Sequence, residues 1–231
     1  SDKILLAFTN NYNTSINAGD DTDGTDNDTL TGANATLFWT STAGNTGIVS
    51  TTNNYPIDTN TIDFSGIETL QGGTGMDTYV LGHVFTNVKG GAGDDTFNLA
   101  NNVNIAIDGE SATGVDTLTL ADTFGVATWA FNESFHDVGS IDFSGIEVAN
   151  GSVNVDTVTV NNTYAGTINT LGGADDITLK ANVTKGLNTG ADSDKILLAF
   201  TDSYNTSIDA GEDTDGTDND TLTGANATLF W

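Results

Sequence analysis

Short runs of alternating apolar and polar residues recur along the chain, and each of them follows an aspartate. The residue two places after the aspartate is apolar or aromatic in every run. Alternation of this kind over about five residues predicts a β-strand with one buried face. Nine such runs begin at Asp2, Asp28, Asp77, Asp95, Asp116, Asp156, Asp175, Asp194 and Asp220.

The spacing of these aspartates indicates how the strands are arranged. Successive aspartates are 26, 49, 18, 21, 40, 19, 19 and 26 residues apart. A period of about 20 residues, with short strands and Gly, Asn and Asp turns, is typical of a parallel β-solenoid. Thr, Asn, Gly and Asp are weak helix formers, and no long stripe of period 3.6 appears. We therefore expect an all-β fold, an elongated right-handed parallel β-solenoid.

The two longest spacers resemble each other. The sequence IDFSGIE occurs at 62–68 and again at 141–147, and a tryptophan precedes it each time, Trp39 and Trp129. We expect hairpin insertions around each tryptophan that protrude from the solenoid or thicken it. Trp39, Trp129, Phe64 and Phe143 are expected to be packing residues rather than ligand-stacking ones.

A longer repeat encloses this pattern. Residues 1–39 return as residues 193–231, an offset of 192, and only Asn10, Asn11, Asn17 and Asp20 are replaced, by Asp202, Ser203, Asp209 and Glu212. Such identity indicates tandem duplication, and we expect the natural chain to extend beyond both ends. The expected organisation is the end of one repeat at 1–27, half-repeats at 28–115 and 116–219, and the start of the next repeat at 220–231.

Charge and composition exclude several classes of function. The net charge is −27, there is no arginine, and lysine is the only strong base. Such a chain cannot neutralise phosphates, so we expect no nucleic-acid binding, and an anionic membrane surface would repel it. No stretch approaches the ~18 apolar residues of a membrane span, so no membrane insertion is expected. The absence of cysteine removes disulfides and thiolate metal sites.

Two glycine-rich segments carry the clearest chemistry. Residues 72–80 and 90–98 both follow the pattern G-G-x-G-x-D-x-U-x, where U is a large apolar residue. This is the calcium-binding nonapeptide of haemolysin-type repeats. Calcium takes six to eight oxygens, glycines let carbonyls turn toward an ion, and aspartate adds charge. The expected ligand-bearing residues are Gly73, Gly75, Asp77, Gly91, Gly93, Asp94 and Asp95, and the alternative is an ordinary Asp/Gly turn. Weaker matches at 151–156 and 171–176 are interpreted as ion-free turns whose aspartates cap backbone N–H groups.

An acidic loop is a second candidate for calcium. It spans residues 20–28 and returns at 212–220. Carboxylates so close together repel one another unless a cation lies among them, although a solvated acidic loop is the alternative. The expected ligands are Asp21, Asp23, Asp26, Asp28, Asp213, Asp215, Asp218 and Asp220.

Catalysis finds no support in the residue pattern. His83 and His136 lie in different half-repeats without an obvious partner, so we expect no enzyme. A glycosidase is not excluded by residue type, but an enzyme rarely needs its site copied in series.

These motifs resemble those of a known family. The chain is similar to the giant β-strand-repeat proteins of bacterial surfaces, which are related to haemolysin-type (RTX) calcium-binding adhesins. The similarity lies in the segments GGTGMDTYVL, GGAGDDTFNL and IDFSGIETLQGG and in the tryptophan segments. The resemblance implies secretion, calcium-dependent folding outside the cell, and a role as an adhesin, a surface fibre or filament, or an S-layer-like matrix component. It is sharp only at residues 62–98.

The leading expectation is therefore a calcium-stabilised structural repeat of an extracellular bacterial protein. Stacked repeats can extend without limit, so the expected partners are neighbouring repeats or other copies, head to tail. The alternatives are a carbohydrate-binding module that contacts cell-surface glycans and an ice-binding solenoid. The Thr pairs Thr29/Thr31, Thr117/Thr119 and Thr157/Thr159 resemble ice-binding ladders, but Asn98 and Leu197 interrupt the array.

Overall fold

The computed structural model describes residues 1–7, 13–19, 27–53, 60–110, 114–199, 205–211 and 218–224. In this part the chain is all-β, as expected, with a single turn of 3-10 helix, η1 (Asp122–Phe124). It divides into two compact units. Unit 1 comprises Ser1–Leu118 and Ser140–Ile146, and unit 2 comprises Thr119–Gly139 and Glu147–Trp231.

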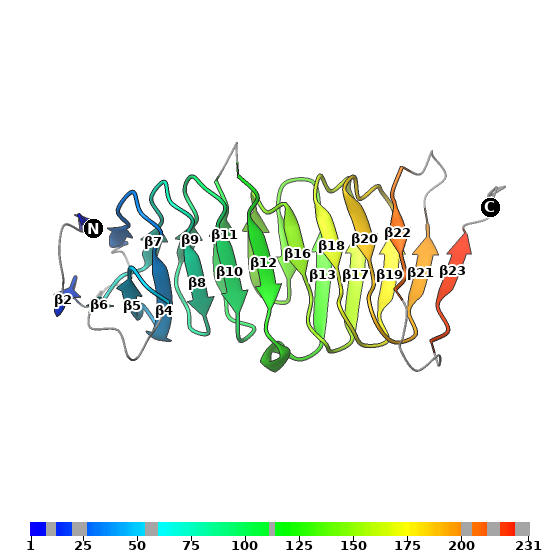
Figure 1. The fold of residues 1–231 in the computed structure, drawn as a ribbon, viewed down its shortest axis with the longest axis horizontal. Helices are drawn as coiled ribbons and strands as arrows, with labels where there is room; N and C mark the ends of the chain where they lie inside the picture. The colour runs from blue at the N-terminus through cyan, green and yellow to red at the C-terminus, as the bar shows by residue number, and fades with distance from the viewer. Residues whose placement is uncertain are drawn as a thin grey trace. The chain divides into compact units, whose positions relative to one another are not determined.

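Unit 1 contains two sheets, here named 1A and 1B (Figure 1). Sheet 1A has the order β1 (Lys3–Leu5), β3 (Thr29–Thr31), β7 (Thr69–Gln71), β9 (Asn87–Lys89), β11 (Ile105–Asp108), β15 (Ile141–Ser144), with all neighbours parallel. Sheet 1B has the order β2 (Asn13–Asn17), β6 (Thr61–Ser65), β5 (Thr46–Ser50), β4 (Phe38–Ala43), β8 (Thr78–Leu81), β10 (Thr96–Leu99). The next strand, β12 (Thr117–Leu120), crosses the boundary between the units.

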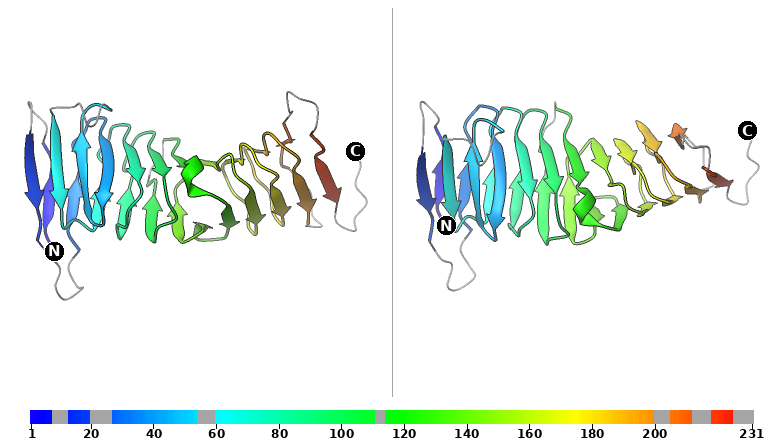
Figure 2. Two further views of the ribbon diagram at one scale, coloured as in Figure 1. Left: turned by 90° about the horizontal axis from the view of Figure 1, so that it is seen from below. Right: turned by 60° about the horizontal axis from the view of Figure 1, so that its bottom comes forward.

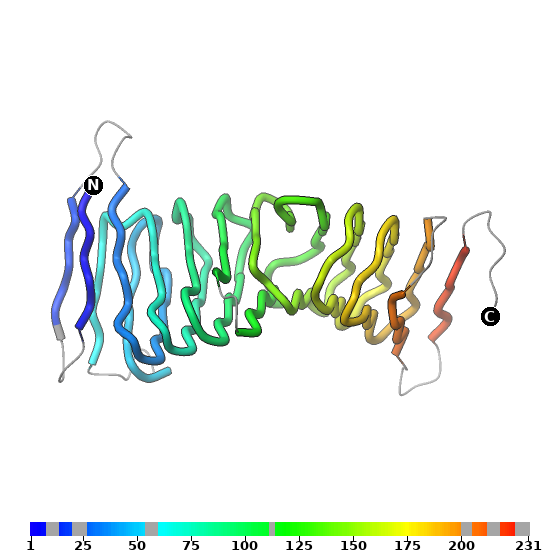
Figure 3. The backbone as a smooth tube through the Cα atoms, turned by 90° about the horizontal axis from the view of Figure 1, so that it is seen from above, coloured from blue at the N-terminus to red at the C-terminus, as the bar shows by residue number. Residues whose placement is uncertain are grey.

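Unit 2 also contains two sheets, named 2A and 2B. Sheet 2A has the order β14 (His136–Val138), β13 (Ala127–Phe131), β17 (Asp156–Val160), β19 (Asp176–Leu179), β21 (Lys195–Leu198), β23 (Thr221–Gly224). Sheet 2B has the order β16 (Val148–Asn150), β18 (Thr167–Asn169), β20 (Gly186–Asn188), β22 (Ile208–Asp209). From β16 to β23 successive strands alternate between the two sheets, so the chain crosses from one sheet to the other at each turn (Figure 3). Long sheets of mostly parallel strands are compatible with a β-solenoid.

The expected strand follows each of the nine aspartates. The residue two places after the aspartate is fully buried in seven of the nine runs: Leu30, Tyr79, Phe97, Leu118, Val158, Ile177 and Ile196. Parallel pairing in register aligns these residues into columns, for example Val158, Ile177 and Ile196 in sheet 2A. The alternation in the sequence is therefore the alternation between the core and the outer face of a sheet.

The long spacer of the first half-repeat contains antiparallel strands. β4, β5 and β6 follow one another in the chain and pair antiparallel within sheet 1B. β4 then pairs in parallel with β8, and β6 with β2. The inserted strands therefore lie within sheet 1B, paired edge to edge with its other strands. They do not protrude from the sheet as a hairpin, which was one of the expected arrangements. In unit 2, β13 and β14 form a second antiparallel pair.

Aromatic side chains fill the core beside these insertions. Trp39 stacks on Tyr79 with a centroid distance of 5.8 Å, and Tyr79 stacks on Phe97 at 4.9 Å. Trp39, Trp129, Phe64 and Phe143 are at most 2% exposed, so the prediction that they are packing residues is confirmed. Burial of these large rings supplies much of the driving force for folding.

The IDFSGIE motif shows that the half-repeats differ in one respect. The strand of the first copy, β6, lies in sheet 1B, whereas the strand of the second copy, β15, lies in sheet 1A.

Two further views in Figure 2 show the strands of each unit in separate layers. Among the described residues, no helix is long and apolar enough to cross a membrane.

Candidate metal-binding turns and the aspartate columns

The two nonapeptide turns of unit 1 lead into neighbouring strands. The turn at 72–77 joins β7 to β8, and the turn at 90–95 joins β9 to β10. A Cβ on Gly73 would collide with the carbonyl oxygen of Ala33 in the turn before it, and a Cβ on Gly91 with the carbonyl oxygen of Gly73. A Cβ on Gly93 would lie 2.6 Å from the carbonyl oxygen of Gly75. These glycines are therefore required by the close stacking of successive turns.

The two turns differ in backbone conformation although their sequence pattern is the same. Gly91 and Gly93 have φ values of +102° and +127°, in the region that favours glycine. Gly73 and Gly75 do not have positive φ. The two turns with the calcium-binding pattern therefore differ in the backbone conformation of their glycines.

The aspartates of these turns point inward and accept hydrogen bonds from backbone amides. Oδ1 of Asp77 accepts the Leu37 N–H (2.8 Å), and Oδ2 accepts the Gly73 N–H (3.1 Å). Oδ1 of Asp95 accepts the Asp77 N–H (2.7 Å), and Oδ1 of Asp116 accepts the Asp95 N–H (2.8 Å). Each carboxylate therefore binds the amide of the preceding turn, and we name this series aspartate column 1.

Unit 2 contains an equivalent series, aspartate column 2. Oδ1 of Asp156 accepts the indole N–H of Trp129 (3.1 Å). The Asp156, Asp175 and Asp194 amides then donate to Oδ1 of Asp175 (2.7 Å), Asp194 (2.8 Å) and Asp220 (3.0 Å). This bears out the interpretation of the weaker glycine motifs as turns in which aspartate caps backbone N–H groups.

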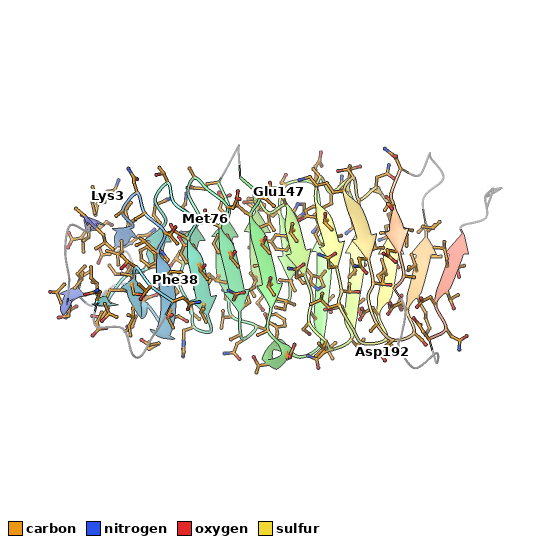
Figure 4. All side chains as sticks on the ribbon, in the orientation of Figure 1. Lys3, Phe38, Met76, Glu147 and Asp192 are labelled. Atoms are coloured by element: carbon orange, nitrogen blue, oxygen red, sulfur yellow. The ribbon has the colours of Figure 1, made fainter. Side chains whose placement is uncertain are left out.

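The turns of unit 2 also reproduce the conformation of the 90–95 turn with fewer glycines. Leu171 and Gly173 have φ values of +74° and +99°, and Gly190 and Asp192 have +89° and +77°. These positions are four and two residues before the column aspartate, as Gly91 and Gly93 are. Positive φ at Leu171 and Asp192 costs conformational energy, which the stacking of neighbouring turns must offset. The side chain of Asp192 is labelled in Figure 4.

Burial raises the pKa of several column carboxyls, those of Asp77, Asp95, Asp156, Asp175 and Asp194. Burial raises the pKa of Asp77 to about 7, in spite of the two amide hydrogen bonds that lower it, and the nearby Asp95 raises it further. Burial likewise raises the pKa of Asp156 to about 6 and of Asp175 to about 7. A carboxyl in this situation is stabilised by taking up a proton or by a neighbouring cation.

The oxygens of the nonapeptide turns are largely committed to hydrogen bonds, which tests their fit to calcium. Both carboxylate oxygens of Asp77 accept amides, the Gly73 carbonyl accepts the Ala92 N–H (3.0 Å), and Oδ1 of Asp94 accepts the Val115 N–H (2.9 Å). Oδ2 of Asp95 is buried without a hydrogen-bond partner among the described residues. Calcium needs six to eight oxygens, so these turns fit the ion poorly as they are arranged here.

The residues of the acidic loop are only partly described. Asp21, Asp23, Asp26, Asp213 and Asp215 lie outside the described residues. Asp28 is buried, and its Oδ1 accepts the Asp2 N–H, so it serves backbone capping. Asp220 belongs to aspartate column 2, and Asp218 lies two residues before it. In the described part of the chain, no group of three or more His, Asp or Glu side chains is placed to hold a metal.

One buried acidic residue that caps a backbone amide was not predicted. Glu68 is buried, its Oε2 accepts the Asp28 N–H (2.8 Å), and its Oε1 accepts the Asn45 side-chain amide (2.9 Å). Glu68 precedes Thr69-Leu70 as Asp28 precedes Thr29-Leu30, so the match of ETL to DTL could have identified it. The longer side chain occupies the place of an aspartate beside β7.

The histidines take part in packing and local polar contacts. His136 is half-buried, with its ring centroid 5.4 Å from Phe131 and 5.1 Å from Tyr164, and burial lowers its pKa. His83 Nδ1 lies 3.4 Å from the Ser41 hydroxyl.

No known family model, curated protein or solved structure matches this chain.

Proposed function

We propose that the chain is a structural repeat of an elongated extracellular bacterial protein, a fibre, adhesin or surface-layer component built as a right-handed parallel β-solenoid. Its role is to extend the array: each repeat presents an edge on which the next repeat continues the sheets. Calcium binding is part of the proposal, centred on the acidic loops 20–28 and 212–220. At the nonapeptide turns, an ion would have to displace amide hydrogen bonds.

The observation that carries the proposal is the pairing of the duplicated segment. In the first copy β1 pairs with β3 through Lys3↔Thr29, Ile4↔Leu30 and Leu5↔Thr31. In the second copy β21 pairs with β23 in the same register, through Lys195↔Thr221, Ile196↔Leu222 and Leu197↔Thr223. The same rule of pairing therefore operates on both sides of the repeat boundary.

The second copy also has a neighbour on its other side. β21 pairs with β19 through Ile177↔Ile196, so the sheet passes from one repeat into the next without a break. An array that continues in this way is stabilised mainly by nearest-neighbour contacts. The proposed role follows from this continuity, since a sheet that propagates through the boundary is suited to building length.

The burial of Trp39 and Trp129 does not favour the carbohydrate-binding alternative. Trp39 and Trp129 are buried, with exposed fractions of 0% and 2%. A sugar-stacking platform needs an exposed ring, and neither tryptophan offers one.

The ice-binding alternative needs regular rows of threonine. The outer Thr rows of sheet 2A are irregular, because Thr157 is followed by Asp176 and Lys195 at the paired positions of the next two strands.

Hydrogen exchange on a lengthened chain tests the proposed array. The Gly32 amide donates to Gln71 of β7 (2.7 Å), whereas the equivalent Gly224 lies in the last described strand. When one further 192-residue repeat is joined after the duplicated segment, the amides of Leu222 and Gly224 should become as protected as those of Leu30 and Gly32. If they exchange at the same rate as before, the repeats fold as separate beads, and the proposal fails.

A further inference from the structure

The outer face of sheet 1B contains a hollow of about 520 Å³, where β2, β6 and β5 lie side by side (Figure 1). Gly47 and Phe64 are buried, so the residues on either side of them in their strands point away from the core. Two rows of paired, outward side chains line the hollow: Ser15, Asp63 and Ile48 in one row, and Asn17, Ser65 and Thr46 in the next. Its volume is within the range of small-molecule sites, about 300–1,000 Å³. Because these side chains stand on the face of the sheet, the hollow does not depend on what lies beside the outer edge of β2.

The polar side chains of the hollow are free to bind a ligand. Among the described residues, the Asp63 carboxylate has no hydrogen-bond donor, and the hydroxyls of Ser15, Ser65 and Thr46 have no hydrogen-bond partner. Oδ1 of Asn17 accepts the Gly19 N–H (2.9 Å), which leaves its Nδ2 group as a donor. The hollow therefore offers a carboxylate acceptor, an amide donor and three hydroxyls that can both donate and accept.

Charge restricts the kind of ligand that fits. Asp63 is the only charged group among the described residues that line the hollow, and the chain as a whole carries a net charge of −27. Phosphate, sulfate and carboxylate groups would therefore be repelled. Ile48 is half-buried and adds an apolar surface between the polar groups. A matching ligand has several hydroxyls, no negative charge and one apolar face, which are the properties of a neutral sugar ring.

We propose that this hollow binds one neutral pyranose residue of a glycan. Asp63 accepts hydrogen bonds from sugar hydroxyls, and a carboxylate acceptor makes these bonds stronger than bonds between neutral groups. Ile48 contacts the C–H face of the ring, while the Asn17 amide donates to a hydroxyl oxygen. The buried Trp39 and Trp129 take no part. The site does not depend on the proposed array, to which it adds a binding role.

The second IDFSGIE motif provides a matched control. Asp142 occupies the position of Asp63 in that motif, and both side chains are exposed. Asp63 lies between Ser15 and Ile48, whereas Asp142 is paired with Ala106 of β11 and does not line this hollow. The same motif is thus present twice, and the hollow depends on the strands that lie beside the first copy.

Titration of the full chain with simple glycosides, followed by NMR, tests the site. The neutral probes are methyl β-glucoside, methyl β-galactoside and methyl α-mannoside, and methyl β-glucuronide is the anionic control. Saturation transfer detects binding, and the shifts of the backbone amides locate it. The variants are Asp63→Asn and Asp142→Asn, which remove the same charge from the two motifs, and Thr46→Val, which removes one hydroxyl and keeps the branched shape. Circular dichroism checks that each variant is folded.

We expect at least one neutral glycoside to bind and to shift the amides of Asp63 and Thr46, and the glucuronide to bind more weakly. Asp63→Asn should weaken binding by about tenfold and Thr46→Val by about threefold, because each loses a hydrogen bond to the sugar. Asp142→Asn should bind like the wild type. The site is wrong if no neutral glycoside binds, if the shifted amides lie elsewhere, or if Asp63→Asn and Asp142→Asn bind equally well. The hydrogen-exchange test on the lengthened chain decides the array separately.

Discussion

At the residue scale, Gly90, five places before the column aspartate Asp95, is required by space. A Cβ on Gly90 would collide with Oδ2 of Asp95 and lie 2.9 Å from the Gly109 carbonyl oxygen. Gly90→Ala should therefore lower the free energy of unfolding by about 1–3 kcal/mol, the usual cost of overpacking a rigid site. Chemical denaturation with urea measures the change.

The control for this substitution is Gly44→Ala. Gly44 has no atom within 4 Å of an added Cβ and does not have positive φ. The same change in chain entropy should therefore leave stability unchanged or slightly higher. Equal urea midpoints for the two variants would mean that the turn at 90–95 relaxes to accept a methyl group, contrary to the close packing described above.

The glycine pattern identified positions at which successive turns stack in direct contact, and the calcium role expected for these glycines stays a prediction. A G-G-x-G pattern is compatible with carbonyls turned toward an ion and with turns stacked in direct contact. In this structure the contact between Gly91 and the Gly73 carbonyl accounts for the glycine. Local sequence could not separate these causes, since Leu171 adopts the same left-handed conformation without being glycine.

At the element scale, the aspartate columns predict how stability depends on pH. The pKa of Asp175 is raised from its ordinary value to about 7, first by burial and then by the charges of Asp156 and Asp194. Because the folded state binds the proton more tightly than the unfolded state does, this group favours folding below the ordinary aspartate pKa of about 4. That contribution is lost as the pH rises through about 7. Column 2 should therefore make the chain more stable at pH 5 than at pH 8.

Asp175→Asn tests this effect directly. The asparagine Oδ1 can still accept the Asp156 N–H (2.7 Å in the wild type), and no charge has to be buried. We expect the variant to gain more than about 1 kcal/mol at pH 8, since one pKa unit corresponds to about 1.4 kcal/mol. Its unfolding free energy should also change less between pH 5 and pH 8. Asp176→Asn removes the same formal charge from an exposed position and should retain the wild-type pH profile; thermal unfolding in EGTA compares the variants.

The sequence predicted the strands well but not the sheets to which they belong. A strand begins at or directly after each of the nine aspartates, as the alternation required. Asp28 nevertheless leads into β3 of sheet 1A, and Asp77 leads into β8 of sheet 1B. Between these two aspartates the chain forms β4, β5 and β6 in sheet 1B and then β7 in sheet 1A, where Glu68 replaces the aspartate, so the next aspartate, Asp77, leads into sheet 1B. Periodicity reports which residues are buried, and it does not report how many strands a spacer contains.

At the scale of the whole molecule, the net charge of −27 opposes the compact state by self-repulsion, which bound divalent cations would relieve. An ion that binds only the folded state at one hundred times its dissociation constant adds about 2.7 kcal/mol per site. We therefore expect calcium to raise the melting temperature by several degrees relative to EGTA, with one duplicated acidic loop contributing at each end of the repeat.

The comparison must separate binding from screening. Sodium chloride at matched ionic strength screens exposed charges without occupying a defined site, so it should produce a smaller rise than calcium. The paired change Asp23→Asn and Asp26→Asn in the first loop tests location, and Asp94→Asn tests the turn whose carboxylate already accepts an amide. A calcium effect that is reduced in the first variant, where the second loop still contributes, and fully retained in the second variant would assign the ion to the acidic loop. Equal melting temperatures in calcium and EGTA for the wild type would remove calcium from the proposed function and leave the aspartate columns to hold the turns together by hydrogen bonds alone.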